Sequence, residues 1–376
     1  MTTLDTPDTP FAVVDAARLD RNIARLRDRL DALGVPLRLH VKTCKSVDVA
    51  GRVHAGGPIT VSTLAEAEHF ADAGYHDILY AVGIDAHKLS RVAALLRRGV
   101  IPTVLLDSLA QAEALTRFAH EEGIRIPALI EIDCDGHRGG IAPTDPALVQ
   151  IGQALGDGLA GVLAHAGESY FAYTPDALRQ AARNERDTVL AAADALRAAG
   201  LPCPIISVGS TPTAHAATDL TGVTEVRAGN YVFFDLVMAG IGLCTTEDLA
   251  LSVVVTVIGH QPDKNWIITD GGWMATSRDR GTAAQAFDQG YGLVADLTGR
   301  LIPDLFMTGA SQEHGILTTR ADSPLPHLPI GTRLRILPNH ACATAAQHDR
   351  YHVISGTTTG SATPVVDAVW PRHNGW

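Results

Sequence analysis

The stretch LRLHVK, residues 37–42, opens a series of short segments that decides the fold. Apolar residues at positions 37, 39 and 41 alternate strictly with basic residues at positions 38, 40 and 42. A period of two is typical of a β-strand, in which successive side chains point to opposite faces. The pattern therefore predicts a strand that ends at Lys42.

Seven further segments of this kind follow, and helix-like stretches separate most of them. An amphipathic stretch at residues 17–33 comes before the first strand and is ended by Gly34, as a left-handed cap requires. Eight strands alternating with helices favour a closed (β/α)8 barrel over the alternative, an open doubly wound sheet. We therefore predict an α/β protein with a TIM-like barrel over residues 16–240. The predicted strands cover residues 37–42, 58–62, 77–81, 102–106, 127–133, 159–165, 203–208 and 224–228.

The sequence beyond residue 240 has a different composition and a different pattern. Runs rich in β-branched residues are separated by Gly, Pro and Asp turns, which is typical of β structure. We predict a second, mostly-β domain made of residues 1–15 and 241–376. Its predicted strands cover residues 251–258, 265–269, 291–295, 333–337 and 351–355.

Charge and cysteine content limit the functions that are compatible with the chain. Its 376 residues include 30 Lys and Arg against 41 Asp and Glu, a formal net charge of −11. This argues against nucleic acid as a partner, because clustered basic residues are needed to neutralise phosphates. Neither a signal-peptide pattern nor a membrane-spanning apolar run is recognisable, so we expect a cytoplasmic protein without a membrane partner. The 5 cysteines form no CxxC pair, which predicts reduced thiols.

Polar residues at the carboxyl ends of barrel strands build the active sites of such barrels. Lys42 would lie at this mouth, where partial removal from water favours loss of its proton and suits Schiff-base chemistry. A surface lysine in a loop is the alternative. The segments SVGSTPT (207–213) and AGNY (228–231) follow the seventh and eighth strands, where barrels commonly bind phosphate. Their small residues and hydroxyl groups would let donors approach an anion.

Two N-terminal motifs carry a resemblance to a known family. The segment TPFAVVD (9–15), followed by HVKTCKS (40–46), resembles the opening of the D-serine dehydratase and D-threonine aldolase family. These are fold-type III pyridoxal-phosphate (PLP) enzymes with an alanine racemase-like barrel. The resemblance implies that Lys42 carries PLP and that Lys45 is only nearby. It also implies four contacts to the PLP phosphate, at Ser210, Thr211, Gly229 and Asn230.

Two further motifs match the family near the cofactor ring. The segment EIDCDGHRGG (131–140) resembles the family's loop whose arginine lies beside the ring, which implies this position for Arg138. The segment HAGESY (165–170) resembles a stretch of the dehydratases and implies that Tyr170 stands near substrate and cofactor, where aldolases carry a histidine. Glu168, if it faces the substrate, would disfavour a side chain with a second carboxylate.

The segment PNHAC (338–342) contains a candidate metal pair. His340 and Cys342 are two residues apart, so in extended chain both side chains leave the same face. Imidazole and thiolate together suit Zn²⁺, whereas a buried cysteine beside a hydrogen-bonded histidine is the alternative. The resemblance implies a catalytic zinc on this pair, with another divalent metal still possible. Two other matching stretches, which include Glu313 and His314, have no assigned role.

The resemblance implies a PLP- and zinc-dependent lyase that converts D-serine to pyruvate and ammonia. Lys42 would remove the proton from Cα, and zinc would polarise the β-hydroxyl group. The alternatives are a D-threo-3-hydroxyaspartate dehydratase, then a D-threonine aldolase, an amino-acid racemase and a non-catalytic PLP-binding protein. A homodimer is also implied, because fold-type III relatives complete each active site with the partner's β domain.

Overall fold

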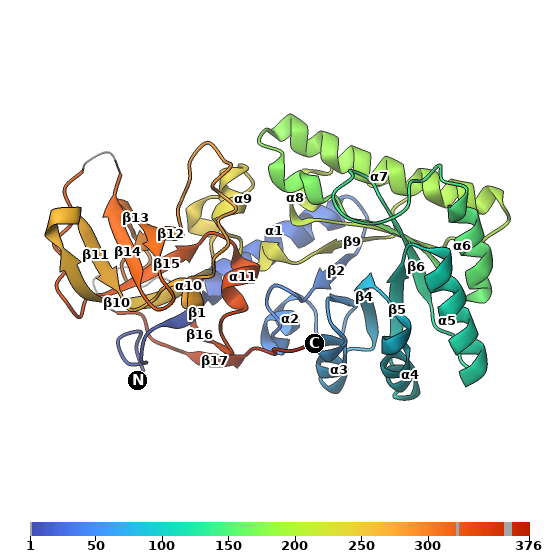
Figure 1. The fold of residues 1–376 in the computed structure, drawn as a ribbon, viewed down its shortest axis with the longest axis horizontal. Coiled ribbons are helices and arrows are strands. Elements are labelled where there is room, and N and C mark those ends of the chain that lie inside the picture. The colour runs from blue at the N-terminus through green and yellow to red at the C-terminus, as the bar shows by residue number, and fades with distance from the viewer. Residues whose placement is uncertain (1, 321–322, 357–362) are drawn as a thin grey trace. The chain divides into compact units, whose positions relative to one another are not determined.

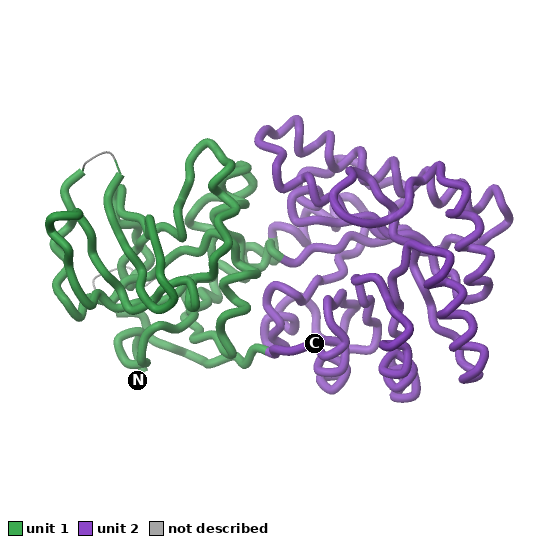
Figure 2. Tube along the Cα trace, viewed as in Figure 1, with its two compact units in different colours: residues 1–24, 230–372 green, residues 25–229, 373–376 purple. Residues whose placement is uncertain are grey.

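A computed structural model describes residues 2–320, 323–356 and 363–376 of the chain (Figure 1). The chain forms two compact units (Figure 2). Unit 1 contains residues 1–24 and 230–372, and unit 2 contains residues 25–229 and 373–376. The predicted domain ranges, 16–240 and 1–15 with 241–376, stay a prediction.

Unit 2 is built on a closed barrel of parallel strands, which confirms the predicted fold class. Each strand pairs with the next, and the last strand closes the ring by pairing with the first, Arg38 lying opposite Arg227. The strands are β2 (Leu37–His40), β3 (Ile59–Val61), β4 (Asp77–Gly83), β5 (Ile101–Leu106), β6 (Ala128–Ile132), β7 (Leu159–Ala164), β8 (Ile205–Val208) and β9 (Glu225–Ala228).

Helices alternate with these strands, and local signals in the sequence set their ends. The hydroxyl groups of Thr63 and Ser108 cap α3 and α5. They accept hydrogen bonds from the main-chain N–H groups of Glu66 and Gln111, respectively. Gly34 follows α1 and has a φ of +69°. This left-handed conformation agrees with the prediction that Gly34 ends the helix. The helices are α1 (Ala16–Ala32), which spans the boundary of the two units, and α2 (Val47–Val53), α3 (Leu64–Asp72), α4 (Leu89–Arg97), α5 (Leu109–Glu122), α6 (Ala147–Leu155), α7 (Pro175–Ala198) and α8 (Thr211–Ala216).

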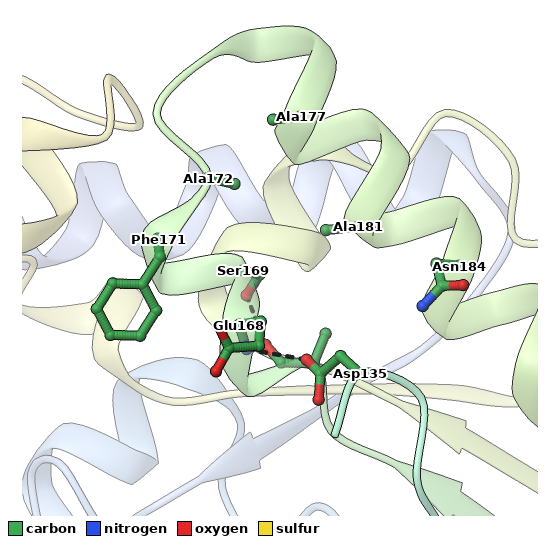
Figure 3. Close-up of a pocket in the computed structure, with 9 residues that line it drawn as sticks. Asp135, Glu168, Ser169, Phe171, Ala172, Ala177, Ala181 and Asn184 are labelled. Atoms are coloured by element: carbon green, nitrogen blue, oxygen red, sulfur yellow. Dashed lines mark hydrogen bonds between the residues drawn. The ribbon is translucent and has the colours of Figure 1, made fainter. Parts of the chain in front are cut away.

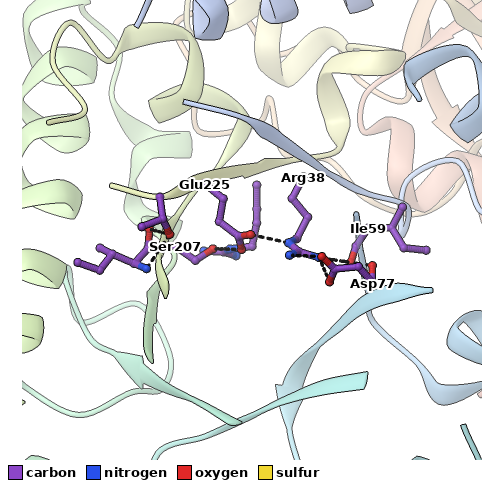
Figure 4. Close-up of polar contacts among 8 residues, drawn as sticks. Arg38, Ile59, Asp77, Ser207 and Glu225 are labelled. Atoms are coloured by element: carbon purple, nitrogen blue, oxygen red, sulfur yellow. Dashed lines mark hydrogen bonds and ion pairs between the residues drawn. The ribbon is translucent and has the colours of Figure 1, made fainter. Parts of the chain in front are cut away.

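Charged side chains occupy part of the barrel interior (Figure 4). Arg38 Nε lies 2.8 Å from Glu225 Oε2, and its Nη1 lies 2.8 Å from Asp77 Oδ1. The Ser207 hydroxyl group donates to Glu225 Oε1 over 2.7 Å. The side chain of Arg38 therefore points into the barrel, where Glu225 lies.

Unit 1 is centred on a sheet with the strand order β11-β14-β13-β12-β15-β10-β1-β16-β17. Buried valines of β10, such as Val253 and Val255, pack with Ile336 of β15 in its core. The mostly-β prediction is confirmed, and three short helices, α9 (Leu236–Gly240), α10 (Trp273–Thr276) and α11 (Ala341–Ala345), add to it. The strands are β1 (Phe11–Asp15), β10 (Leu251–Gln261), β11 (Trp266–Thr269), β12 (Gly292–Ala295), β13 (Leu301–Ala310), β14 (Gly315–Thr319), β15 (Arg333–Pro338), β16 (Arg350–Ile354) and β17 (Ala368–Pro371).

The structure corrects two local predictions. Strand β2 ends at His40, so Lys42 lies in the turn of residues 41–44 rather than in the strand. The chain is not extended from His340 to Cys342, because Ala341–Ala345 forms a helical turn that has His340 as its N-cap. Within the described parts of the chain, no helix has both the length and the apolar character needed to cross a membrane.

Candidate active site

Lys42 lies at the mouth of the barrel, in the turn that follows β2. The Val41 N–H donates to Thr60 O over 2.9 Å, and the Lys45 N–H donates to Val41 O over 2.7 Å. These bonds fix the turn on both sides of Lys42, whose side chain is half-buried. The lysine that the motif predicted as the PLP carrier is therefore held at the end of the barrel where active sites form.

Two partly buried histidines lie within electrostatic reach of Lys42. Burial and the charge of Lys42 hold the pKa of His40 well below its usual range. The same two causes lower the pKa of His165 to about 3. His165 Nδ1 lies 2.8 Å from the Gly209 carbonyl oxygen, so the neutral ring donates from Nδ1. Both rings are consequently neutral near pH 7.

The turn after β8 has the properties of an anion-binding cradle. Ser210 caps α8 and forms a reciprocal capping box with Thr213. Ser210 and Thr211 are both buried, and Gly209 comes so close to β9 that an added Cβ would lie 1.9 Å from Arg227 O. Only glycine fits at Gly209, with φ +149°, so the turn packs closely against the next strand.

The second predicted phosphate segment is divided between the two units. In unit 2, an added Cβ at Gly229 would lie 2.4 Å from His40 O, which again requires glycine. In unit 1, Asn230 Nδ2 donates to Asp235 Oδ2 over 2.6 Å and lies 4.0 Å from Cys342 Sγ. The side-chain amide of Asn230 is therefore engaged within unit 1, and a phosphate contact would use its main-chain N–H group.

Arg138 and Tyr170 lie in the loops that follow β6 and β7. Arg138 Nη2 is 3.5 Å from Glu131 Oε1, and just over half of the Arg138 side chain is exposed. Burial raises the pKa of Glu131, although Arg138 opposes the rise. The Tyr170 ring centroid lies 6.5 Å from that of His165. His165 thus lies close to Tyr170 and also within electrostatic reach of Lys42.

Arg227 is a member of this group that sequence reasoning missed. It is buried on β9, where its Nε donates to Ser207 Oγ over 2.8 Å and its Nη2 donates to Ala164 O. Its charge lowers the pKa of both His40 and His165, which places it in the same region as Lys42. The alternation of Glu225 and Arg227 with apolar residues in β9 is the signal that could have identified it.

Glu168 lines a hollow beside α7 (Figure 3). Its Oε1 lies 2.8 Å from His137 Nδ1, and its main-chain N–H donates to Asp135 Oδ2 over 2.9 Å. The other walls come from Phe171 and from Asn184 and small residues of α7. The carboxylate is therefore engaged with His137, and its predicted effect on a second substrate carboxylate stays a prediction.

The candidate metal pair lies in unit 1, at the start of α11. His340 and Cys342 interact through their side chains, and His340 Nδ1 lies 2.5 Å from Asp279 Oδ2. Burial lowers the pKa of His340, but Cys342 and Asp279 outweigh it and hold the pKa well above its usual range. The hydrogen bond from His340 also holds the pKa of Asp279 below its usual range. Asp279 thus fixes the ring through Nδ1 and leaves Nε2 to face a metal ion.

A second carboxylate holds the backbone between these two residues. Asp235 is fully buried, and its Oδ2 accepts the Ala341 N–H over 2.8 Å as well as the amide of Asn230. Imidazole and thiol are thus presented side by side, which fits Zn²⁺. Within residues 2–320, 323–356 and 363–376 no group of three or more His, Cys, Asp or Glu side chains is arranged to hold a metal ion.

Glu313 and His314 lie between β13 and β14. The main-chain carbonyl of His314 accepts the Ser311 N–H over 2.8 Å, which closes the turn. Both side chains are exposed within unit 1. His314 is therefore a turn residue in this structure, and its role in the chemistry stays unassigned.

Comparison with known proteins identifies two family domains in the chain. The family described as "Alanine racemase, N-terminal domain" matches residues 14–237. The family described as "Putative serine dehydratase domain" matches residues 250–354. The barrel residues and the metal pair fall within these two ranges, respectively.

Relatives match the chain over nearly its whole length. It is 56% identical over 385 residues to the D-threo-3-hydroxyaspartate dehydratase of Delftia sp. (strain HT23), with 100% of this chain and 99% of the relative covered. It is 28% identical over 375 residues to the D-serine dehydratase of Dictyostelium discoideum, with 93% of each covered.

Solved structures agree with the sequence comparison. The D-threo-3-hydroxyaspartate dehydratase from Delftia sp. HT23 matches with a TM-score of 0.95 at 54% identity, with 100% of both chains covered. The D-threonine aldolase from Filomicrobium marinum matches with a TM-score of 0.81 at 27% identity, with 98% of this chain and 96% of that chain covered. These findings confirm the predicted fold class and the resemblance. The chain belongs to the D-serine dehydratase and D-threonine aldolase family.

Proposed function

We propose that this enzyme is a PLP- and metal-dependent dehydratase of D-3-hydroxy amino acids, and that D-threo-3-hydroxyaspartate is its preferred substrate. The observation that carries the reaction type is the presence, in one chain, of Lys42 at a barrel mouth and of the His340–Cys342 pair. The 56% identity to a D-threo-3-hydroxyaspartate dehydratase favours this substrate over D-serine, which the motifs alone placed first, and it opposes the prediction that Glu168 disfavours a second carboxylate.

Lys42 is the residue to which we assign PLP. When bound, PLP supplies an electron sink that stabilises negative charge at the Cα of an amino acid. The Lys42 amine, once displaced by the incoming amino acid, would take the Cα proton as general base. Burial keeps His40 and His165 neutral, and Arg227 is a cation whose charge acts on both of these rings.

The turns after β8 and β9 would hold the PLP phosphate. Ser210 and Thr211 offer hydroxyl groups, and the close approach that Gly209 and Gly229 allow supports contacts from the main chain. We assign Asn230 to the phosphate through its main-chain N–H group, because its side-chain amide donates to another partner. The phosphate thus anchors the cofactor at the carboxyl ends of two neighbouring strands.

Arg138 and Tyr170 would flank the reacting atoms. Arg138 can donate to a polar atom of the PLP ring and so tune the electron sink, while its contact with Glu131 limits how far it can swing. Tyr170, close to His165, would stand beside the bound amino acid. A tyrosine at this position favours dehydration over carbon–carbon cleavage, for which the family uses a histidine.

His340 and Cys342 would hold the metal ion. A bound Zn²⁺ ion supplies a Lewis acid that polarises the β-hydroxyl group and so improves it as a leaving group. Asp279 keeps His340 oriented through Nδ1, and Asp235 keeps the intervening peptide in place. The imidazole–thiolate set favours Zn²⁺, because Mg²⁺ prefers oxygen ligands.

The products distinguish the candidate reactions. Loss of the Cα proton and the β-hydroxyl group gives an enamine, which water converts to a keto acid and ammonia. D-Serine would yield pyruvate, and D-threo-3-hydroxyaspartate would yield oxaloacetate. A D-threonine aldolase would instead release glycine and an aldehyde, without ammonia.

A D-amino-acid screen of the purified enzyme, with and without a chelator, tests the proposal. We expect ammonia and oxaloacetate from D-threo-3-hydroxyaspartate, slower pyruvate formation from D-serine, and loss of both on chelation with recovery on adding Zn²⁺. Glycine and aldehyde as the main products, or turnover indifferent to chelation, would refute the proposal.

We also propose that the enzyme is a cytoplasmic homodimer. Support for the dimer comes from the family resemblance, and support for the compartment comes from the cysteines, which the sequence predicts to be reduced thiols. Light scattering coupled to size-exclusion chromatography would give twice the chain mass of 39.7 kDa if the dimer is correct. A monomer mass at micromolar concentration would contradict it.

A further inference from the structure

Glu185 is a carboxylic acid on the buried face of α7. The buried positions of this helix are otherwise apolar, with Leu178, Ala182 and Val189 on the same stripe. The side chain of Glu185 is 1% exposed. A carboxyl group in such a place is strongly destabilising unless hydrogen bonds replace the lost water. The arrangement therefore points to a specific task for this residue.

Hydrogen bonds from two different turns converge on this carboxyl group. Oε1 accepts the Ala166 N–H over 3.0 Å and the Gly209 N–H over 2.9 Å. Oε2 accepts the Thr213 hydroxyl group over 2.7 Å. Ala166 belongs to the turn after β7 that leads to Tyr170, whereas the other two donors belong to the phosphate cradle after β8. Glu185 thus ties two active-site turns to one helix.

These contacts also orient a chain of hydroxyl groups. The Ser169 hydroxyl donates to Ala166 O over 2.6 Å, and that of Thr213 donates to Glu185. Ser210 Oγ lies 2.8 Å from Ser169 Oγ and 3.0 Å from Thr213 Oγ1, and it accepts the Thr213 N–H over 3.2 Å. The hydrogens of Ser169 and Thr213 are thus committed to a carbonyl and a carboxyl group. Ser210 is therefore the donor in its contact with Ser169 or with Thr213, and its side chain is held in place by both.

We propose that Glu185 is a positioning residue for the cofactor phosphate. By accepting hydrogen bonds from both turns, it fixes the phosphate cradle against the turn that carries Tyr170 and holds Ser210 in place through Thr213. The inference rests on the proposed PLP site. It goes beyond that site because Glu185 lies on a helix and acts only through its neighbours.

A buried acid near a phosphate dianion needs a compensating positive charge. Arg227, also fully buried, attracts Glu185 electrostatically. Burial raises the pKa of Glu185, while the bonds from Thr213 and Gly209 and the charge of Arg227 oppose the rise. The two hydrogen-bond donors and the positive charge of Arg227 together favour the form of Glu185 that accepts hydrogen bonds beside the phosphate.

The isosteric variant Glu185→Gln tests the proposal. The glutamine oxygen can still accept two N–H groups, but its NH₂ group cannot accept the hydroxyl hydrogen of Thr213, so the bond that holds Thr213, and through it Ser210, is lost. Apoenzyme is titrated with PLP and, separately, with pyridoxal, which lacks the phosphate. We expect PLP binding to weaken by about tenfold or more, as the loss of a charge-assisted hydrogen bond predicts, with pyridoxal binding unchanged.

Two other variants complete the experiment. Asp187→Asn makes the same chemical change at an exposed position of α7 and should leave both ligands unaffected. Thr213→Val removes one contact of Glu185 at nearly constant volume and should weaken PLP binding in the same selective way, even if Glu185→Gln folds poorly.

The ratio of the pyridoxal and PLP dissociation constants decides the outcome. A ratio unchanged in both Glu185→Gln and Thr213→Val overturns the proposal while leaving the PLP site intact. Equal weakening of both ligands, with a lower melting temperature, shows a purely structural role and also overturns it. If the wild-type apoenzyme binds neither ligand, the proposed function itself fails.

Discussion

Replacement of Asp279 by asparagine tests how the metal pair is held. The Asp279 carboxylate lies 2.5 Å from His340 Nδ1 and is half-buried. Asparagine keeps the size and one acceptor oxygen but removes the negative charge that raises the basicity of the imidazole. Loss of such an outer carboxylate typically lowers metal affinity 10- to 100-fold, or about 1.4–2.7 kcal/mol at 25 °C. We therefore expect Zn²⁺ binding to weaken within this range.

Competition with a chromophoric chelator measures this affinity without using turnover. Substitution with Co²⁺ adds an absorption spectrum that reports the thiolate ligand and the coordination geometry. Asp288→Asn is the matched control, since it removes a carboxylate of the same unit that pairs with Arg280 at the surface. Unchanged Zn²⁺ affinity in Asp279→Asn, or an equal loss in the control, would refute the role assigned to Asp279.

Three further predictions concern the metal, the pH dependence of stability and the barrel interior. Cys342→Asp should lower the preference for Zn²⁺ over Mn²⁺, because a carboxylate oxygen is a harder ligand; equal affinity ratios in variant and wild type would contradict this. Burial lowers the pKa of His165 to about 3 and that of His215 to about 4, both below the ordinary value of 6.5. The unfolded chain therefore binds their protons first, and the free energy of unfolding should fall below pH 6.5 by up to about 1.4 kcal/mol per pH unit for each histidine. Urea denaturation between pH 7.5 and 5 checks this, and His215→Gln should flatten the fall. Arg38→Leu should reduce the free energy of unfolding by about 3–5 kcal/mol, because it removes the cation in direct contact with the buried Glu225; a change below about 1 kcal/mol in urea denaturation would contradict the buried pair.

The barrel could be predicted because its strands are short apolar runs between turn residues. Strands β1, β13, β14 and β17 were not among the predicted strands, and an irregular local pattern accounts for the miss in β13. In β13, for instance, Pro303 is followed by Asp304 with φ +59°, which interrupts the period of two. Hydrogen bonds to neighbouring strands, such as those between β13 and β12, impose the extended conformation there instead.

Some residues of the candidate site could likewise be predicted from the sequence, and others could not. Lys42 adjoins the end of a recognisable strand, so its place could be predicted within two residues. Asp279 and Asp235 could not, because their roles come from contacts across 61 and 106 residues of sequence. Glu185 and Arg227 left a signal in the sequence, namely a charge at a position where the helix or strand pattern requires an apolar residue.

Borohydride reduction of the PLP-loaded enzyme, followed by peptide mapping, tests the central claim most directly. The hydride fixes any imine between PLP and a lysine as a stable amine. We predict a single pyridoxyl label on Lys42 and no label in Lys42→Ala. A label on the neighbouring Lys45, or none on the wild-type protein, would contradict the account.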